Sequence, residues 1–302
     1  MSPEPAGRSA DRTTRPADGE QPGELEVHRV APAAAELRAA LYRGEVFQLP
    51  PSKATLALVT TAEQTLEREL GPSPRQAHRA LPDEAFFAAV GRVRRALFCE
   101  PESQQQAIAC AAPLADAALT ELAIDPARIR VIVPGSHRNP RAAPIYVHHR
   151  DTWYAHPEAV ITAWIPLHDM TPSETFRLFP EALTRVVAND SEVFNYGDWV
   201  RDGDQLKVGW QAREAGRTVR YPGLIGPPPE DPGVGFAARR GELLLFAGAH
   251  FHRTHPREGR LTRFSLDFRV VHLGDHAAGL GAPNVDNRSR GSAVVDYVRA
   301  RP

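Results

Sequence analysis

Hydrophobic residues in the first third of the chain recur at the three- and four-residue spacing of amphipathic helices. Leucines between positions 56 and 70 predict one helix that begins after Ser52, a capping residue, and ends at Gly71. Similar patterns predict helices over 32–41, from 81 to about 98, and from 102 to about 122, with one strand over 44–49. We expect these helices to brace one face of a sheet.

From Pro126 onward the pattern changes to short, β-branched and often alternating segments separated by turn residues. Helices followed by many short strands indicate an α+β chain. The core expected for such a chain is a double-stranded β-helix, the jelly-roll arrangement also found in cupins. The predicted strands cover 129–133, 143–151, 160–167, 175–179, 242–247 and 262–272.

The same pattern divides the chain into regions. Residues 1–24 contain almost no large hydrophobic side chain and are expected to form a disordered tail. Residues 25–302 are expected to form a single domain, with an insert rich in Pro and Gly that is long enough to act as a lid or a binding segment. Within that domain we predict a mainly helical part (25–125), a jelly-roll core (126–273), the insert (188–236) and a C-terminal tail (274–302).

Composition narrows the classes of partner. Lys and Arg total 36 against 37 Asp and Glu, so no basic field indicates a nucleic-acid partner. No hydrophobic run is long enough for a membrane span, and the N-terminal residues lack a secretory signal pattern. Two cysteines, Cys99 and Cys110, do not make a disulfide framework. We therefore expect a cytoplasmic protein without a nucleic-acid or membrane partner.

Candidate metal ligands occur in two places. His149 and Asp151 are two residues apart on a predicted strand, so both side chains point to one side of the sheet. A third ligand can come from His250 or His252, which we expect on one face of a later strand. These positions are about 6.6 Å apart along a strand, so only one of the two can bind the same ion. Two histidines and one carboxylate form the facial triad of non-haem Fe(II) oxygenases, whereas a hydrogen-bonded structural pair is the alternative for His149 and Asp151.

Arg263 and Ser265 share one face of the last long strand. A guanidinium offers two parallel charge-assisted hydrogen bonds to a carboxylate, and a serine hydroxyl can add a third. Such a pair suits the far carboxylate of a dicarboxylate whose keto-acid end chelates the metal. An exposed sheet charge is the alternative for Arg263, and the flanking hydrophobic residues disfavour it.

With these residues the chain resembles the Fe(II)/2-oxoglutarate-dependent oxygenases, in particular the phytanoyl-CoA dioxygenase-like branch. The resemblance implies a jelly-roll dioxygenase that uses Fe(II), 2-oxoglutarate and O2 to oxidise, most simply to hydroxylate, a small molecule, with release of succinate and CO2. It favours His252 over His250 as the third ligand, because the arginine follows His252 by a similar gap in that family. It also implies that Arg263 and Ser265 bind 2-oxoglutarate and that Trp164 lines the co-substrate pocket.

The resemblance leaves the substrate open, although secondary metabolism is one expected setting. Residues expected near a substrate are Trp153, Tyr146, His250 and Arg130, and Arg130 can equally form a salt bridge at the sheet edge. Competing hypotheses are a cupin-type metal-dependent hydrolase or isomerase, and a binding module without activity on the same fold. The pair Arg263 and Ser265 separates the oxygenase from the cupin-type alternative, which needs no dicarboxylate clamp. The intact set of metal ligands argues against the binding module, which needs no open positions on a metal.

Overall fold

The computed structural model describes residues 25–139, 145–202 and 221–301, so the predicted disordered tail lies outside the described residues. Its centre is a six-stranded antiparallel sheet in the order β1-β5-β3-β7-β2-β8. The strands are β1 (Phe47–Leu49), β2 (Leu122–Ile132), β3 (Ile161–Pro166), β5 (Leu243–Ala247), β7 (Arg263–His272) and β8 (Val298–Arg299).

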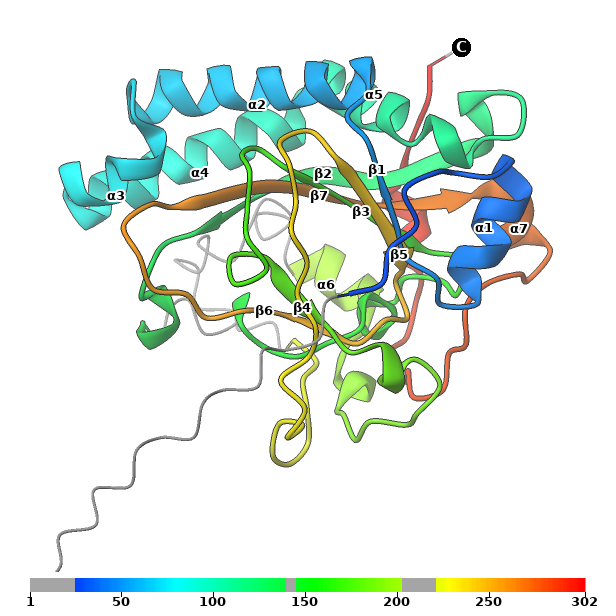
Figure 1. Cartoon of the computed structure of the whole chain (residues 1–302). Coiled ribbons are helices and arrows are strands. Elements are labelled where there is room, and N and C mark those ends of the chain that lie inside the picture. Colours follow the sequence, from blue (N-terminus) through cyan, green and yellow to red (C-terminus); the bar gives the residue numbers. More distant parts are fainter. Residues whose placement is uncertain (1–24, 140–144, 203–220, 302) are drawn as a thin grey trace, which may run out of the picture.

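Helices cover one face of this sheet (Figure 1). The helix α2 (Lys53–Leu70) begins at Ser52, whose side chain accepts from the backbone N–H of Thr55, and ends at Gly71 with a positive φ of 84°. Hydrophobic residues from these helices and from alternate strand positions form one large core. The remaining helices are α1 (Ala34–Tyr42), α3 (Ala77–Ala80), α4 (Asp83–Cys99), α5 (Pro101–Cys110), α6 (Tyr196–Asp202) and α7 (Leu273–Ala277).

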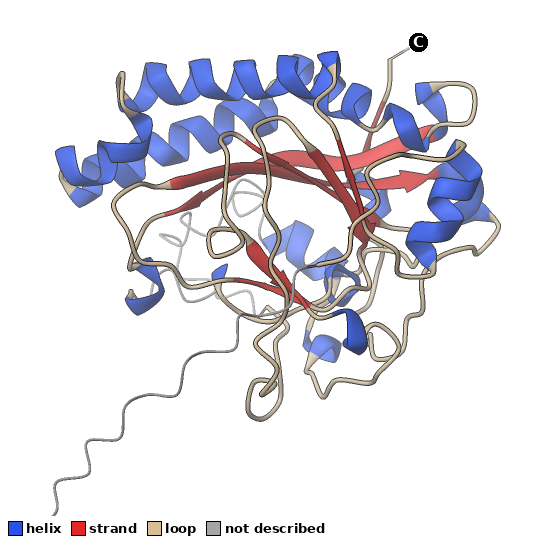
Figure 2. Cartoon of the chain, viewed as in Figure 1, coloured by secondary structure: helices blue, strands red, loops and turns tan. Residues whose placement is uncertain are grey.

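A smaller sheet faces the uncovered side of the large one (Figure 2). It contains β4 (Phe176–Leu178) and β6 (His252–Thr254). Isolated bridges extend it on both sides, from His149 to His252 and from Leu178 to Val234. A second hydrophobic cluster fills the space between the sheets, with side chains such as those of Trp164 and Phe176. Two facing sheets with helices on one outer face confirm the predicted jelly-roll architecture.

Two strand predictions around the candidate ligands were wrong. Of the predicted strand 143–151, the described part from 145 onward has only a single bridge at His149, and Asp151 begins a short 3-10 helix (Asp151–Tyr154). The segment that carries His250 and His252 is not one strand either, because β5 ends at Ala247 and a turn separates it from β6. Gly248 permits this turn, since a Cβ there would collide with the side chain of Val160.

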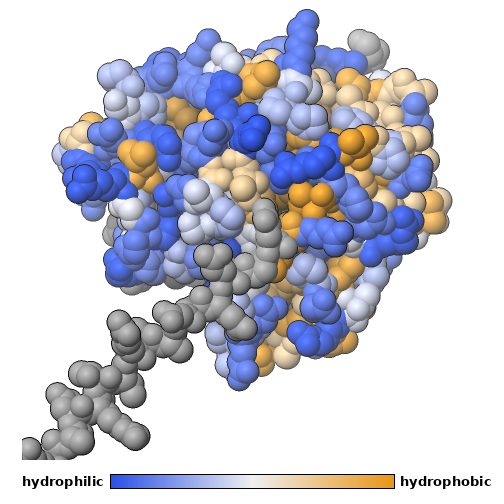
Figure 3. Space-filling view, in the orientation of Figure 1, coloured by the Kyte–Doolittle hydropathy of each residue, from blue (hydrophilic) through white to orange (hydrophobic). Residues whose placement is uncertain are grey.

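Helix and insert boundaries also differ from the predictions. The helix expected over 102–122 ends at Cys110, and short 3-10 turns lead into β2, which begins four residues before Pro126. Part of the predicted insert, 203–220, lies outside the described residues, while Phe236 packs against Trp164. Within the described residues no helix combines the length and hydrophobicity needed to cross a membrane. On the face shown in Figure 3, hydrophilic residues predominate and hydrophobic ones form small groups.

Candidate functional site

The residues His149, Asp151 and His252 meet between the two sheets. One ligand atom from each lies within 4.8 Å of the other two, and Nε2 of His149 is 4.0 Å from Oδ1 of Asp151. The antiparallel bridge between His149 and His252 sets this geometry, because directly paired residues point to the same face. Asp151 reaches the cluster from the start of the 3-10 helix. The structure therefore brings the three predicted residues together, although the backbone that carries them differs from the predicted strands.

The hydrogen bonds of the two imidazoles prepare them for a metal. Nδ1 of His149 is 3.0 Å from the carbonyl oxygen of Val147, and Nδ1 of His252 is 3.0 Å from that of His250. A carbonyl can only accept, so each Nδ1 carries the proton and each Nε2 keeps a free lone pair. Burial, followed by repulsion from His252, lowers the pKa of His149 to about 3. Both effects keep this ring neutral at physiological pH, the form that binds metal ions.

Both carboxylate oxygens of Asp151 are held by neighbouring side chains. Thr162 Oγ1 donates to Oδ2, and Arg269 Nη2 donates to Oδ1 over 2.6 Å. Burial alone would raise the pKa of Asp151, but the charge and the hydrogen bond of Arg269, together with the two histidines, outweigh burial and hold that pKa well below the usual value of 3.8. The side chain is therefore an ionised ligand in a fixed orientation.

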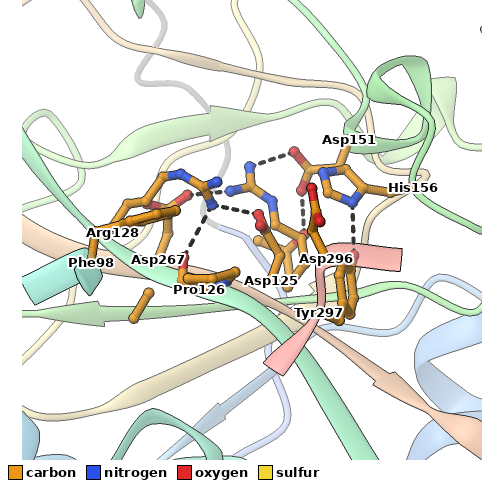
Figure 4. A network of polar contacts seen from close by, with 12 residues as sticks. Phe98, Asp125, Pro126, Arg128, Asp151, His156, Asp267, Asp296 and Tyr297 are labelled. Carbon is orange, nitrogen blue, oxygen red and sulfur yellow. Dashed lines mark hydrogen bonds and ion pairs between the residues drawn. The ribbon is translucent and has the colours of Figure 1, made fainter. Parts of the chain in front are cut away.

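The network continues away from Asp151 along the inner face of the large sheet (Figure 4). Arg269 Nη1 donates to Asp267 over 2.9 Å, and Arg130 donates to both oxygens of Asp267 at 2.7 Å each. Alternate positions of β7 thus carry Asp267 and Arg269 toward the site, while their neighbours point into the helix-covered core. Arg130 forms the salt bridge that the sequence offered as one of its two roles.

Arg263 and Ser265 lie on this inner face with unused donors. Arg263 is only 2% exposed; its Nη1 donates to the carbonyl of Glu174 over 3.2 Å, but its Nε has no partner. The hydroxyl of Ser265, which is fully buried, also has none. Buried donors in folded proteins nearly always have partners. These atoms are therefore suited to a ligand that brings its own acceptor oxygens.

A second arginine, Arg257, stands close to Arg263. It forms an ion pair with Glu174 at 2.9 Å, while its Nε and Nη1 are buried without partners. Burial, followed by repulsion from Arg257, lowers the pKa of Arg263 to about 10, so the guanidinium of Arg263 remains charged at neutral pH. An anionic group between the two arginines would satisfy several donors at once.

Hydrophobic side chains surround the candidate ligands. Trp164 is 4% exposed, and its ring packs edge-on against Phe176 and Phe236. Phe176 and Phe246 both contact the ring of His252 at centroid distances of 5.9 and 5.5 Å. Trp164, which was predicted to line the co-substrate pocket, belongs to this hydrophobic wall.

Two predicted substrate contacts are wrong. The ring of His250 is fully buried between the carbonyls of Ala247 and Gly44, each 3.1 Å away, because it belongs to the turn after β5 and not to the strand of His252. Trp153 is also fully buried, and its indole donates to Asp286 over 2.8 Å. Tyr146 remains a candidate, since it is half-buried with its hydroxyl 2.7 Å from Ser136 Oγ.

Sequence reasoning missed two residues of the site and the partner of a third. Arg269 shares the alternating face of Arg263 on β7 and was expected, like Arg130, at the mouth of the barrel or in a sheet-edge salt bridge, but its partner Asp151 was not predicted. Thr162 faces the site from β3 for the same reason. Arg257 belongs to the connection between β6 and β7, where no periodic pattern indicates its direction.

Comparisons with known proteins gave matches only among solved structures. No family model matches the chain, and no curated protein matches it. The non-heme alpha-ketoglutarate-dependent epimerase SnoN from nogalamycin biosynthesis is 14% identical with a TM-score of 0.39, covering 79% of this chain and 83% of its own. EvdO2 from Micromonospora carbonacea var. aurantiaca is 14% identical with a TM-score of 0.45, covering 81% and 94%.

A third similar structure is the non-heme alpha-ketoglutarate-dependent carbocyclase SnoK from nogalamycin biosynthesis. It is 16% identical with a TM-score of 0.39, covering 81% of this chain and 87% of its own. SnoN and SnoK are both alpha-ketoglutarate-dependent enzymes. At this identity and with TM-scores below 0.5 the likeness assigns no activity, and the function has to be argued from the site itself.

Proposed function

We propose that the protein is a non-haem Fe(II)- and 2-oxoglutarate-dependent dioxygenase that oxidises, most simply hydroxylates, a small molecule. One observation carries the proposal: Arg269, which holds Asp151 of a His-Asp-His cluster with both Nε2 atoms free, shares its face of β7 with the buried, unpartnered donors of Arg263 and Ser265. The cluster supplies three ligands on one side of a metal and leaves the other positions open. The donors supply what a dicarboxylate co-substrate needs.

The residues present fit such a metal. His149, Asp151 and His252 would hold it, since the two histidines are neutral and the carboxylate is ionised. When bound, iron with 2-oxoglutarate and O2 supplies the oxidising power, with succinate and CO2 as products. Arg269 and Thr162 fix the orientation of the Asp151 carboxylate, as outer partners of metal ligands commonly do.

The remaining side chains position the co-substrate and keep water out. Arg263 and Ser265 would bind the far carboxylate of 2-oxoglutarate, with Arg257 as the second cation at that end. The rings of Trp164, Phe176 and Phe246 form a dry wall next to His252. A water-poor pocket strengthens the charge interactions that hold the co-substrate and protects a reactive intermediate from side reactions.

The same observations disfavour the competing hypotheses. A cupin-type hydrolase or isomerase requires the metal cluster but has no use for a buried arginine and serine with free donors. A binding module has no need of neutral histidines with free Nε2 atoms beside an ionised aspartate.

An anaerobic binding experiment followed by a turnover assay tests the proposal. We expect the purified chain to bind one Fe(II), to bind 2-oxoglutarate only in the presence of the metal with micromolar affinity, and to release succinate when O2 is admitted with a suitable substrate. Stoichiometric binding of Fe(II) with no binding of 2-oxoglutarate would favour the cupin-type alternative. Failure to bind any divalent metal would favour the binding module.

A further inference from the structure

A row of basic residues crosses the outer face of the small sheet, on the side opposite to the metal cluster. Arg177 of β4 pairs directly with Arg253 of β6. The bridge between His149 and His252 places His148 next to Arg253, and the bridge between Leu178 and Val234 places Gly235 next to Arg177. Paired residues share a face, so the row runs His148, Arg253, Arg177, Gly235.

Several nitrogens of the two guanidinium groups in this row have no partner among the described residues. Arg177 is only 5% exposed, yet its Nε and Nη1 are buried without a hydrogen bond. Nε of the half-buried Arg253 and Nδ1 of His255, two residues further along that face, are also buried without partners. Among the residues that the structure describes, no carboxylate forms an ion pair with Arg177 or Arg253.

Folding alone does not account for this arrangement. Like charges directly opposite each other on neighbouring strands destabilise a sheet, and burying an unpaired charge is costly. Burial, followed by repulsion from Arg253, indeed lowers the pKa of Arg177. By contrast, the buried Arg150 is matched with Asp286 at 3.0 Å, and the buried Arg38 with Asp275 at 2.7 Å. The missing counter-charge in the row therefore points to an external anion.

A glycine leaves room for the side chain of Arg177, and aromatic rings close the other end of the row. A side chain at Gly235 would collide with Nη1 of Arg177, so this glycine lets the guanidinium lie against the backbone. The row carries the two guanidinium groups of Arg177 and Arg253, which face the same side of the small sheet. His148 packs against Phe179 and Phe251, which form the hydrophobic floor at one end.

We propose that Arg177 and Arg253, together with His255, form a binding site for a small oxyanion, a phosphoryl or carboxylate group, on the outer face of the small sheet. Two guanidinium groups present planar sets of N–H donors that match the oxygens of such groups. The site is distinct from the proposed co-substrate site at Arg263, because Arg177 and Arg253 lie on the opposite face of the small sheet from His252.

Calorimetric titration of the full chain with inorganic phosphate, and separately with acetate at constant ionic strength, tests this site. We expect at least one of the two anions to bind at a single site. Tighter binding of phosphate would identify a phosphoryl group as the ligand, and tighter binding of acetate would identify a carboxylate. Arg177→Gln and Arg253→Gln should each raise the dissociation constant at least tenfold. The matched control Arg240→Gln removes an arginine paired with Glu63 at the surface and should change it less than twofold.

The variant Arg263→Gln separates the two anion sites. It should leave phosphate or acetate binding unchanged, whereas loss of that binding would place the anion at Arg263 and overturn the proposal. The two row variants should also unfold at a higher temperature than the wild type when no anion is added, because each removes an uncompensated charge. Equal affinity in Arg177→Gln, Arg253→Gln and wild type, or no binding of either anion, would likewise contradict the site.

Discussion

At the residue scale, His252 and His250 are two histidines whose side chains have different surroundings. His252 directs Nε2 to the metal cluster, whereas both ring nitrogens of His250 contact backbone carbonyls. We therefore expect His252→Ala to abolish stoichiometric Fe(II) binding. His250→Ala should keep the metal and lose roughly 1–3 kcal/mol of stability, because a buried carbonyl is left without its donor. Metal analysis and urea unfolding of both variants check this, and iron lost only from His250→Ala would overturn the assignment.

We expect Arg263 and Arg257 to contribute unequally to the binding of 2-oxoglutarate. Arg263→Gln should weaken 2-oxoglutarate binding by about 2–5 kcal/mol, the usual cost of truncating one member of a buried charge pair. Arg257→Gln should weaken it less, since part of that charge is already neutralised by Glu174. Fe(II) affinity should be unchanged in both. Anaerobic titrations measure all four values, and an Arg263 variant that binds 2-oxoglutarate like the wild type would place the clamp elsewhere.

What the sequence could predict at this scale follows from its periodicity. Alternation along 262–272 predicts that Arg263 and Ser265 share a face, and in the structure both have unpartnered donors there. The alternation rule gave the wrong orientation for the side chain of His250, because the chain turns between Ala247 and His252. The indole of Trp153 has a distant partner, Asp286, and no local pattern contains such a contact.

At the element scale, the N-terminus of α2 is fixed by a reciprocal pair of hydrogen bonds between Ser52 and Thr55. Ser52→Ala should therefore lower the free energy of unfolding by about 1 kcal/mol, as loss of a capping side chain typically does. Ser73→Ala is the matched control, because Ser73 precedes a 3-10 helix without a side-chain cap bond. Urea unfolding measures both, and equal losses would show that the cap contributes nothing specific.

Elements with strong periodicity were predictable from sequence, and those set by tertiary contacts were not. The predicted strand 160–167 corresponds to β3. The predicted helix after Ser52 corresponds to α2, and its capping residues Ser52 and Gly71 mark its two ends in the sequence. The helix predicted over 102–122 was too long, because the alanine-rich stretch after Cys110 breaks into 3-10 turns before β2 pairs with β7. Helix propensity there is overridden by sheet pairing.

At the scale of the whole molecule, acid stability should depend on buried neutral histidines. Burial lowers the pKa of His156 to about 4 despite the nearby charge of Asp125, and burial lowers that of His168 to about 4 as well. His156 contacts the hydroxyl of Tyr297 at 2.7 Å, and His168 Nε2 accepts from the backbone of Phe264 at 3.3 Å. Protonation would break the second contact outright, because a protonated ring cannot accept a hydrogen bond.

The sign of the pH effect follows from proton binding. An unfolded histidine titrates near pH 6.5, so between pH 6.5 and 4 the unfolded chain binds more protons than the folded one, and stability falls as the pH falls. Each histidine should contribute a loss of about 2 kcal/mol between pH 7.5 and pH 5. Carboxylates with a lowered pKa, such as Asp267, add their loss only at lower pH. Urea unfolding at the two pH values should show a loss smaller by about 1–2 kcal/mol in His156→Gln than in the wild type. The exposed His276 provides the control variant His276→Gln, and equal losses in all three proteins would contradict the role of His156.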